Sequence, residues 1–368
     1  MSITLPAPRP ELHDLQPYVG GESSVPGIAR AIKLASNESA LGPSPKAVAA
    51  VRDAASLLHR YPDGACHALR TALAGHFGLD AARIVCGAGS DELITLLARA
   101  YAGPGDEVLY TEHGFLMYPI AAVAVGARAI AAPEVALTAD PDSLLALVGP
   151  RTRVVFLANP NNPTGTYLST DALKHLRRRL PDNVLLVLDL AYAEFVDAAD
   201  YGPCWELVDA HDNVVVTRTY SKIYGLGGLR LGWAYMPAAI ADVLNRLRNP
   251  FSVSSAAQAA GIAALGDVQF VERARDHNRV WRAWTTDKLR ALGLSVGDSY
   301  ANFVLVRFPV EPGTDSAAAD AFLKQRGIIA RRMNSYRLPD ALRLSIGLET
   351  EMRAAVDVLT DFVQGTPR

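Results

Sequence analysis

A lysine that follows hydroxyl side chains is the residue best suited to covalent chemistry in this chain of 368 residues. Lys222 ends the segment TYSK (219–222), which follows a predicted strand over 214–217, and Arg230 comes eight residues later. A lysine amine acts as a nucleophile only in its neutral form, which burial or nearby cations favour. The pattern predicts a reactive amine held near a bound anion. A surface lysine in a loop is the alternative.

A carboxylate ends the most apolar predicted strand, which covers 184–189 and begins with the apolar run 184–188. Asp189 is the next residue, and Tyr192 follows three positions later. Burying a carboxylate is costly unless it is paired, so an aspartate at the inner end of a buried strand is either paired or functional. A solvated aspartate at the end of the strand is the alternative.

A glycine-rich turn, GAGSDE (87–92), connects a predicted strand to a predicted helix. Backbone N–H groups at the start of a helix attract anions, and glycine allows an anion to approach closely. The alternative is an ordinary strand–helix turn capped by Ser90 or Asp91. Neither this turn nor the second glycine-rich segment, GLGGLR (225–230), has the GxGxxG spacing of a dinucleotide-binding fold.

A stiff loop, NPNNPTG (159–165), follows the predicted strand over 154–158. Its two prolines and its glycine fix a turn at the carboxyl end of that strand. Ligands bind at these ends in open α/β sheets. The asparagines add polar groups that a simple turn does not need.

Other kinds of site lack their motifs. The eight histidines form no HExxH pattern and no pair near carboxylates, so no metal is predicted. There is no GxSxG turn of a serine hydrolase. The three cysteines are scattered and do not form the framework of a secreted disulfide scaffold.

Strands and helices alternate along the first two thirds of the chain, which predicts an α/β fold with a mostly parallel sheet covered by helices. Beyond about residue 265 a long charged helix leads into a smaller α+β part. We therefore predict an N-terminal arm with part of the small domain (1–50), a large domain (51–265) and a small C-terminal domain (266–368). The predicted strands are 83–86, 107–110, 154–158, 184–189, 214–217, 303–307 and 342–346, and the clearest helices are 91–101 and 170–180.

The composition is typical of a cytoplasmic enzyme, which is our prediction. Half of the residues are hydrophobic, and 36 basic against 38 acidic side chains leave a net charge of −2. This balance gives no basic surface for nucleic acid. The chain begins without a signal-peptide pattern, and no stretch is long and apolar enough to span a membrane.

The order of these segments resembles that of the fold-type I pyridoxal-phosphate aminotransferases over nearly the whole chain. Within that family it is most similar to the histidinol-phosphate aminotransferases. The matching segments are LQPYVGG (15–21), SNESALGPSP (36–45), RYPDG (60–64), GAGSDELI (87–94), NPNNPTG (159–165), TYSKIYGLGGLRLG (219–232), PFSVSSAAQAAGIAAL (250–265), GIIARR (327–332) and LRLSIG (342–347).

The resemblance implies roles for the catalytic residues with pyridoxal 5'-phosphate as cofactor. Lys222 corresponds to the lysine that forms a Schiff base with the cofactor. Asp189 corresponds to the carboxylate that keeps the pyridine nitrogen protonated, so that the ring withdraws electrons. Asn162 and Tyr192 correspond to groups that hydrogen-bond the ring 3-oxygen.

The resemblance also implies how the rest of the cofactor is bound. Phe115 takes the place of an aromatic residue that stacks on the ring, which is tyrosine in many relatives. Tyr61 corresponds to a tyrosine that reaches the cofactor phosphate of a neighbouring subunit, which implies a homodimer. The residues that correspond to the phosphate-binding group are Gly89, Ser90, Thr219, Ser221 and Arg230.

Substrate binding is implied for Asn162 and for three further residues. Arg343 and Arg331 correspond to arginines that bind a substrate anion, and Tyr18 to a residue of the arm that closes over the substrate. Because Arg332 is adjacent to Arg331, the sequence leaves open which of the two faces the substrate.

The implied reaction moves an amino group between glutamate and imidazole acetol phosphate in histidine biosynthesis, giving histidinol phosphate and 2-oxoglutarate. An aminotransferase for Phe and Tyr is the main alternative, and a phosphothreonine decarboxylase is the next. A non-catalytic cofactor-binding or regulatory protein is disfavoured because Lys222, Asp189 and Tyr192 are all present. A nicotinamide-dependent dehydrogenase is disfavoured because the GxGxxG motif is missing.

Overall fold

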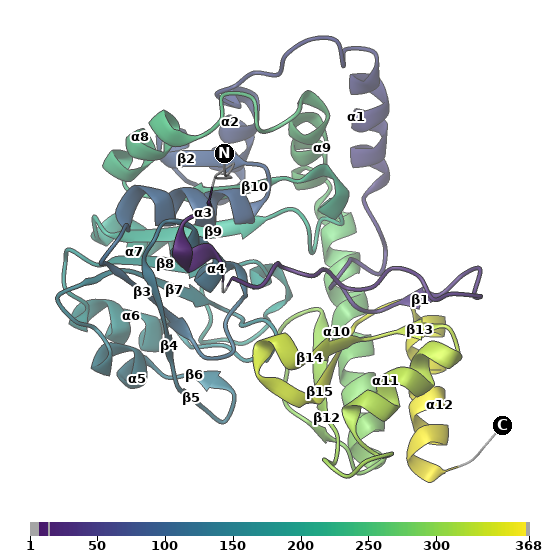
Figure 1. Ribbon diagram of the computed structural model, residues 1–368. Helices are drawn as coiled ribbons and strands as arrows, with labels where there is room; N and C mark the ends of the chain where they lie inside the picture. The colour runs from purple at the N-terminus through teal and green to yellow at the C-terminus, as the bar shows by residue number, and fades with distance from the viewer. Residues whose placement is uncertain (1–6, 14, 366–368) are drawn as a thin grey trace, which may run out of the picture.

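A seven-stranded sheet forms the larger part of the molecule in the computed structural model, which describes residues 7–13 and 15–365 (Figure 1). Every neighbouring pair in it is parallel except those of β10, which is antiparallel to both β2 and β9. The predicted fold class is therefore confirmed. In sheet order the strands are β2 (Ile84–Gly87), β10 (Gly232–Tyr235), β9 (Val214–Thr219), β8 (Leu185–Asp189), β7 (Thr152–Ala158), β3 (Glu107–Thr111) and β4 (Arg128–Ala132).

The central strands are apolar throughout because helices cover both faces of the sheet. In β8, Leu186 and Leu188 pack into one core cluster, whereas Leu185 and Val187 pack into another. This alternation is the two-residue period of a strand buried on both sides. The first face is covered by α2 (His67–Phe77), α6 (Thr170–Arg179) and α9 (Ser255–Leu265), and the second by α3 (Ser90–Tyr101), α4 (Met117–Ala124) and α8 (Ala238–Leu247).

Serine side chains fix where several helices begin. Ser44, Ser169 and Ser254 each accept a hydrogen bond from the backbone N–H three residues later, at the starts of α1 (Pro45–Ala55), α6 and α9. Such caps satisfy one of the four N–H groups that have no partner within a helix.

The shorter elements are α5 (Pro141–Ala146), α7 (Trp205–Ala210), the hairpin β5 (Glu134–Val135) and β6 (Thr138–Ala139), and the 3₁₀ turns η1 (Pro10–Leu12), η2 (Ala81–Arg83), η3 (Ala193–Phe195), η4 (Gly227–Leu229) and η5 (Asn334–Tyr336).

A second, antiparallel sheet lies in the C-terminal third of the chain. Its order is β11 (Ser295–Val296), β12 (Phe303–Arg307), β15 (Leu338–Ser345) and β14 (Arg331–Met333). Its helices are α10 (Val268–Ala291), α11 (Ser316–Gln325) and α12 (Glu349–Gln364).

The N-terminal segment crosses from the large sheet to the C-terminal part of the chain (Figure 1). There β1 (Ile32–Lys33) pairs in parallel with β13 (Ile328–Ile329). This pairing supports our proposal that the first 50 residues contribute to the small domain. The division at residues 50 and 265 stays a prediction.

Strands β4 and β10 of the large sheet were missing from the predicted elements. In β10, Gly-Trp-Ala-Tyr, the two strand-favouring aromatic residues alternate with Gly and Ala, and in β4, Arg-Ala-Ile-Ala-Ala, one isoleucine stands among alanines, so neither short run carries a strong strand signal. Across the described residues, none of the helices has the length and apolar character needed to cross a membrane.

Candidate active site

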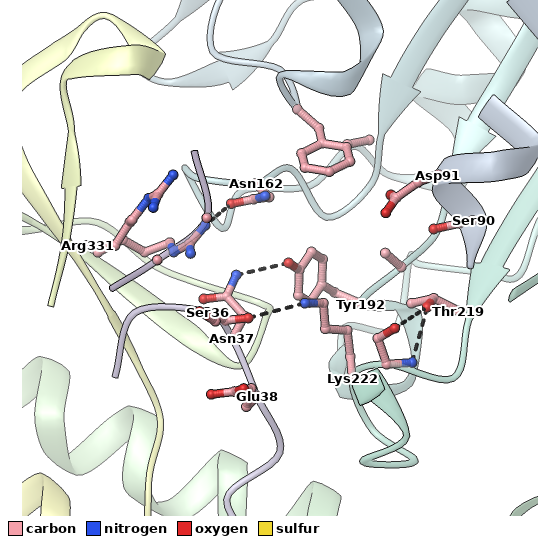
Figure 2. A pocket seen from close by; sticks show the side chains of 18 of the residues that line it. Ser36, Asn37, Glu38, Ser90, Asp91, Asn162, Tyr192, Thr219, Lys222 and Arg331 are labelled. Atoms are coloured by element: carbon pink, nitrogen blue, oxygen red, sulfur yellow. Dashed lines mark hydrogen bonds between the residues drawn. The ribbon is translucent and has the colours of Figure 1, made fainter. Parts of the chain in front are cut away.

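The carboxyl ends of β7, β8 and β9 meet strands of the second sheet around a cavity of about 330 Å³ (Figure 2). Because parallel strands end at the same edge, the loops that follow them lie next to one another. All but two of the predicted site residues line this cavity. They are Tyr18, Ser90, Phe115, Asn162, Asp189, Tyr192, Thr219, Ser221, Lys222, Arg230, Arg331 and Arg343.

Asp189 is a buried carboxylate held by two hydroxyl groups. Tyr118 donates to its Oδ2 at 2.8 Å, and Thr217 donates to its Oδ1 at 3.0 Å. Burial raises the pKa of Asp189 to about 6, and the two hydrogen bonds act in the opposite direction. The described residues place no cation within salt-bridge distance of it. The carboxylate is therefore available to a positively charged ligand in the cavity.

Lys222 extends into the cavity from the turn after β9. Its Nζ lies 3.4 Å from the carbonyl oxygen of Ser36 and 5.7 Å from the centre of the Tyr192 ring. Burial, followed by the nearby Arg343 guanidinium, lowers the pKa of Lys222 to about 8. At pH 7 about a tenth of the molecules then carry the neutral amine, against roughly 0.03% for an ordinary lysine. The amine is therefore prepared to act as a nucleophile or a base.

An anion-binding cradle is built where α3 begins. Thr219 donates to Ser221 Oγ at 3.0 Å and also accepts from the Ser221 backbone N–H at 3.1 Å, which fixes both hydroxyls beside the helix start. Arg230, in the left-handed region at φ +55°, lies 3.2 Å from a carboxylate oxygen of Asp91. The N–H groups at a helix start, two hydroxyls and an arginine together suit a phosphate group.

Gly89 lies behind the cradle rather than in the wall of the cavity. Its φ is +89°, and a Cβ at this position would lie 2.4 Å from Arg230 Nη2. A Cβ on Gly232 would lie 2.3 Å from the backbone nitrogen of Ser90. Both positions need glycine so that Arg230 and the start of α3 can come together.

A second cationic group lies across the cavity from the cradle. Arg343 donates through Nη1 to the side-chain oxygen of Asn162 and through Nη2 to the Ala35 carbonyl oxygen at 2.9 Å. It is buried, and its Nε has no hydrogen-bond partner among the described residues. Figure 2 shows Arg331 and Asn162 on one side of the view and Ser90 and Thr219 on the other.

Arg331, not Arg332, faces the cavity. Neighbouring residues of a strand point to opposite faces, and in β14 it is Arg331 that contributes to the cavity wall. Its guanidinium also donates to the carbonyl oxygen of Val19 in the N-terminal segment. Tyr18 packs edge-on against Phe115, with ring centres 6.1 Å apart.

Tyr61 lies outside the cavity. Its side chain is 83% exposed and stacks on Phe251, with ring centres 4.7 Å apart. Its contacts among the described residues do not bring it to the site.

Several residues of the site were not predicted from the sequence. Tyr118 and Thr217 hold Asp189, and Thr217 is the register partner of Asp189 across β8 and β9. That register was the available signal for Thr217, because a hydroxyl stands opposite a carboxylate near the ends of two predicted strands. The other unpredicted residues in the wall are Gly20, Gly21, Ala35, Ser36, Asn37, Glu38, Asp91, Ala158, Pro160, Ala191, Gly227 and Tyr336. Among the described residues, no group of three or more His, Cys, Asp or Glu is arranged to hold a metal ion.

The chain is similar to known aminotransferases along its whole length. Residues 29–359 match the family model for aminotransferase class I and II. Histidinol-phosphate aminotransferases from Paramagnetospirillum magneticum and Rhodospirillum centenum are 58% and 57% identical to it, and each alignment covers 98% of this chain and 99% of the relative. The crystal structure of histidinol-phosphate aminotransferase from Sinorhizobium meliloti in complex with pyridoxal-5'-phosphate superposes with a TM-score of 0.89 at 30% identity, covering 100% of both chains.

Replacing Lys222 by methionine is expected to stabilise the ligand-free protein below pH 8. A pKa lowered from 10.5 to about 8 means that the charged amine costs the folded state about 3 kcal/mol at neutral pH. This difference should disappear as the pH rises from 8 to 10.5, where the amine of the unfolded chain also loses its proton. Urea denaturation of both proteins at pH 7 and pH 10 measures it. Equal stability of the two proteins at pH 7 would contradict the environment described for Lys222.

Proposed function

The chain belongs to the class I and II aminotransferases, and from this we propose that its cavity transfers an amino group between histidinol phosphate and 2-oxoglutarate with pyridoxal 5'-phosphate as cofactor. The observation that carries the proposal is the pair of anion-binding groups on either side of Lys222 (Figure 2). One suits the phosphate of the cofactor, and the other suits the anionic end of a substrate. This reaction is a step of histidine biosynthesis.

The residues of the cavity fit the cofactor in three respects. The cradle offers hydroxyls, helix N–H groups and Arg230 to a phosphate. Asp189 is a buried carboxylate without a cationic partner in the described part of the chain, and it would pair with a protonated ring nitrogen. Phe115 places an aromatic ring in the wall of the same cavity. When bound, the cofactor supplies an aldehyde for an amine and a ring that withdraws electrons from the reacting carbon.

The residues of the chain would then bind and move protons. Lys222, whose amine is partly neutral at physiological pH, would take a proton from the substrate carbon onto Nζ as a general base and then, as a general acid, deliver it to the carbon at the other end of the 1,3-proton shift. Asp189 would hold the ring nitrogen in its protonated form. Asn162 and Tyr192 would hydrogen-bond the ring oxygen.

Two arginines allow one cavity to bind two substrates with different anionic groups. Glutamate carries two carboxylates, whereas histidinol phosphate carries a phosphate and no carboxylate. Guanidinium groups stay charged and can bind either anion through two parallel hydrogen bonds. Arg343 and Arg331 both line the cavity, so one site can serve both half-reactions. Tyr18 would add a hydrogen bond from the N-terminal segment.

An aminotransferase for Phe and Tyr is the second candidate. The aromatic side chains of Tyr18, Phe115 and Tyr336 in the cavity wall favour it, because they offer an apolar surface to an aromatic substrate.

We also propose that the enzyme is a homodimer in which Tyr61 reaches the cofactor phosphate of the neighbouring site. The exposure of the Tyr61 side chain supports this proposal. Three apolar side chains near it are exposed as well: Leu57 and Leu58, which precede it in sequence, and Phe251, on which it stacks. Monomers rarely leave such groups of large apolar side chains in water. The cytoplasmic location stays a prediction.

Substrate preference separates the two candidates. We expect histidinol phosphate to be favoured over histidinol by roughly a hundredfold or more in kcat/KM, because two charge-assisted hydrogen bonds to the phosphate are lost together. Arg343→Ala should weaken both half-reactions, since the same guanidinium binds glutamate. Steady-state rates with histidinol phosphate, histidinol, Phe and Tyr decide the matter. If Phe or Tyr is used faster than histidinol phosphate, the second candidate replaces the first.

Mixed dimers test the role of Tyr61. Co-expressed Lys222→Ala and Tyr61→Ala chains should form some dimers in which one site has both Lys222 and the partner's tyrosine. Random pairing predicts recovery of roughly a quarter of the wild-type activity, more than the average of the two separate variants. Lys222→Ala mixed with wild type is the control for dilution of sites. Activity no higher than that average would mean that Tyr61 serves its own site or none.

A further inference from the structure

Asn37 occupies a buried position between the second sheet and the ring of Tyr192 (Figure 2). Its φ of +54° lies in the left-handed region, which asparagine enters more readily than most residues. The backbone is held there from both sides. The N–H of Asn37 donates to Ser345 Oγ at 2.7 Å, and its carbonyl oxygen accepts from the amide of Asn302 at 3.0 Å.

These contacts decide which way the Asn37 amide faces. Ser345 Oγ accepts the fixed backbone N–H and lies 3.2 Å from Asn37 Oδ1, to which it donates its own proton. If the amide were turned over, Ser345 would have to accept from both nitrogens and its proton would lose this acceptor. Ser345 is 3% exposed, so water does not replace it. A buried donor without an acceptor is costly, so Nδ2 is the amide atom that faces Tyr192.

The orientation of the amide fixes the role of the Tyr192 hydroxyl. Asn37 Nδ2 donates to Tyr192 Oη at 2.9 Å, so this oxygen is the acceptor on that side. Burial raises the pKa of Tyr192 to about 12, so the phenol keeps its proton at neutral pH. Among the residues that the structure describes, no oxygen accepts this proton, and Tyr192 lines the cavity.

We propose that Asn37 is a positioning residue that directs the Tyr192 phenolic proton into the cavity, toward the ring oxygen of bound pyridoxal phosphate. This inference rests on the proposed function, because the acceptor belongs to that cofactor. The chain of bonds runs from the Asn37 backbone N–H through Ser345 and the Asn37 amide to Tyr192. A hydroxyl that accepts one hydrogen bond also becomes a better donor of its own. Asn37 therefore orients the Tyr192 hydroxyl and strengthens it as a donor.

This hydrogen bond should affect the protonation of the bound cofactor, which can be measured separately from the stability of the fold. A hydrogen bond donated to the ring oxygen stabilises the negative charge on that oxygen. This charge is greatest in the deprotonated form of the bound cofactor, so the hydrogen bond favours that form over the protonated one. It therefore lowers the pH at which the bound cofactor gains a proton, which is visible as the midpoint of its absorbance change. Lys222, Asp189 and Arg343 also line the cavity, and their charges would affect this midpoint. The variants below leave these three residues in place.

Asn37→Gly tests the proposal on the cofactor-loaded enzyme. Glycine accepts the positive φ, so both backbone hydrogen bonds can remain while the amide is removed. We expect the absorbance midpoint to rise by roughly 0.5 pH unit, and by more in Tyr192→Phe. In the Tyr192→Phe background, Asn37→Gly should cause no further rise. Ser345→Ala, which frees the amide to turn over, should shift the midpoint in the same direction, and it carries the test if Asn37→Gly does not fold.

Asn302→Ala is the matched control, because Asn302 bonds the carbonyl oxygen of Asn37 and not its amide. Its midpoint should stay at the wild-type value even if its melting temperature falls. The proposal is overturned if Asn37→Gly leaves the midpoint unchanged while Tyr192→Phe moves it, or if Asn302→Ala shifts it as far as Asn37→Gly. A chain that takes up no pyridoxal phosphate would overturn this inference and the proposed function together. A titrating cofactor that is insensitive to Asn37 would overturn the inference alone.

Discussion

The site depends on one buried carboxylate that has no cationic partner within the described chain. Asp189 ends the central strand β8 and relies on the hydroxyls of Tyr118 and Thr217. Those two groups come from α4 and from the neighbouring strand β9, so the carboxylate is held only when sheet and helix are assembled. Its raised pKa reflects a charge that the protein alone stabilises incompletely. A protonated ring in the cavity would supply the missing partner, so the cofactor proposal accounts for an otherwise unfavourable arrangement.

The remaining groups of the cavity follow from the meeting of two sheets. The large sheet contributes the cradle at the start of α3 and the amine of Lys222, whereas the second sheet contributes Arg331 and Arg343. Hydrogen bonds reach the large-sheet side from the second sheet and from the N-terminal segment: Arg343 donates to Asn162, and Asn37 donates to Tyr192. The binding of a substrate anion by the arginines is thereby linked to side chains that would touch the cofactor. A substitution of a substrate-binding residue on the second sheet is therefore expected to affect the residues of the large sheet that would touch the cofactor.

The sequence was informative where the physical signal is local. Continuous apolar runs predicted the central strands, and the residues just after them proved to line the cavity, as Asp189 and Lys222 do. Asn37 and Tyr118 could not be predicted in this way, because their partners lie 155 and 71 residues away in sequence. Only the folded chain brings such groups together, and no spacing rule encodes the contact. The role proposed for Tyr61 involves a second chain, so no contact within one chain gives a signal for it.

The chemistry proposed for the cavity requires that Lys222 is the amine that bonds the cofactor. Reduction of the enzyme with borohydride in the presence of pyridoxal phosphate, followed by digestion and mass spectrometry, tests it directly. We expect a pyridoxyl group on the peptide that contains Lys222 and unmodified peptides for the other lysines, such as Lys33, Lys46 and Lys174. We also expect Lys222→Ala to bind the cofactor without being labelled and without turning over. Stable labelling at another lysine, or turnover by Lys222→Ala near the wild-type rate, would mean that Lys222 is not the amine that bonds the cofactor.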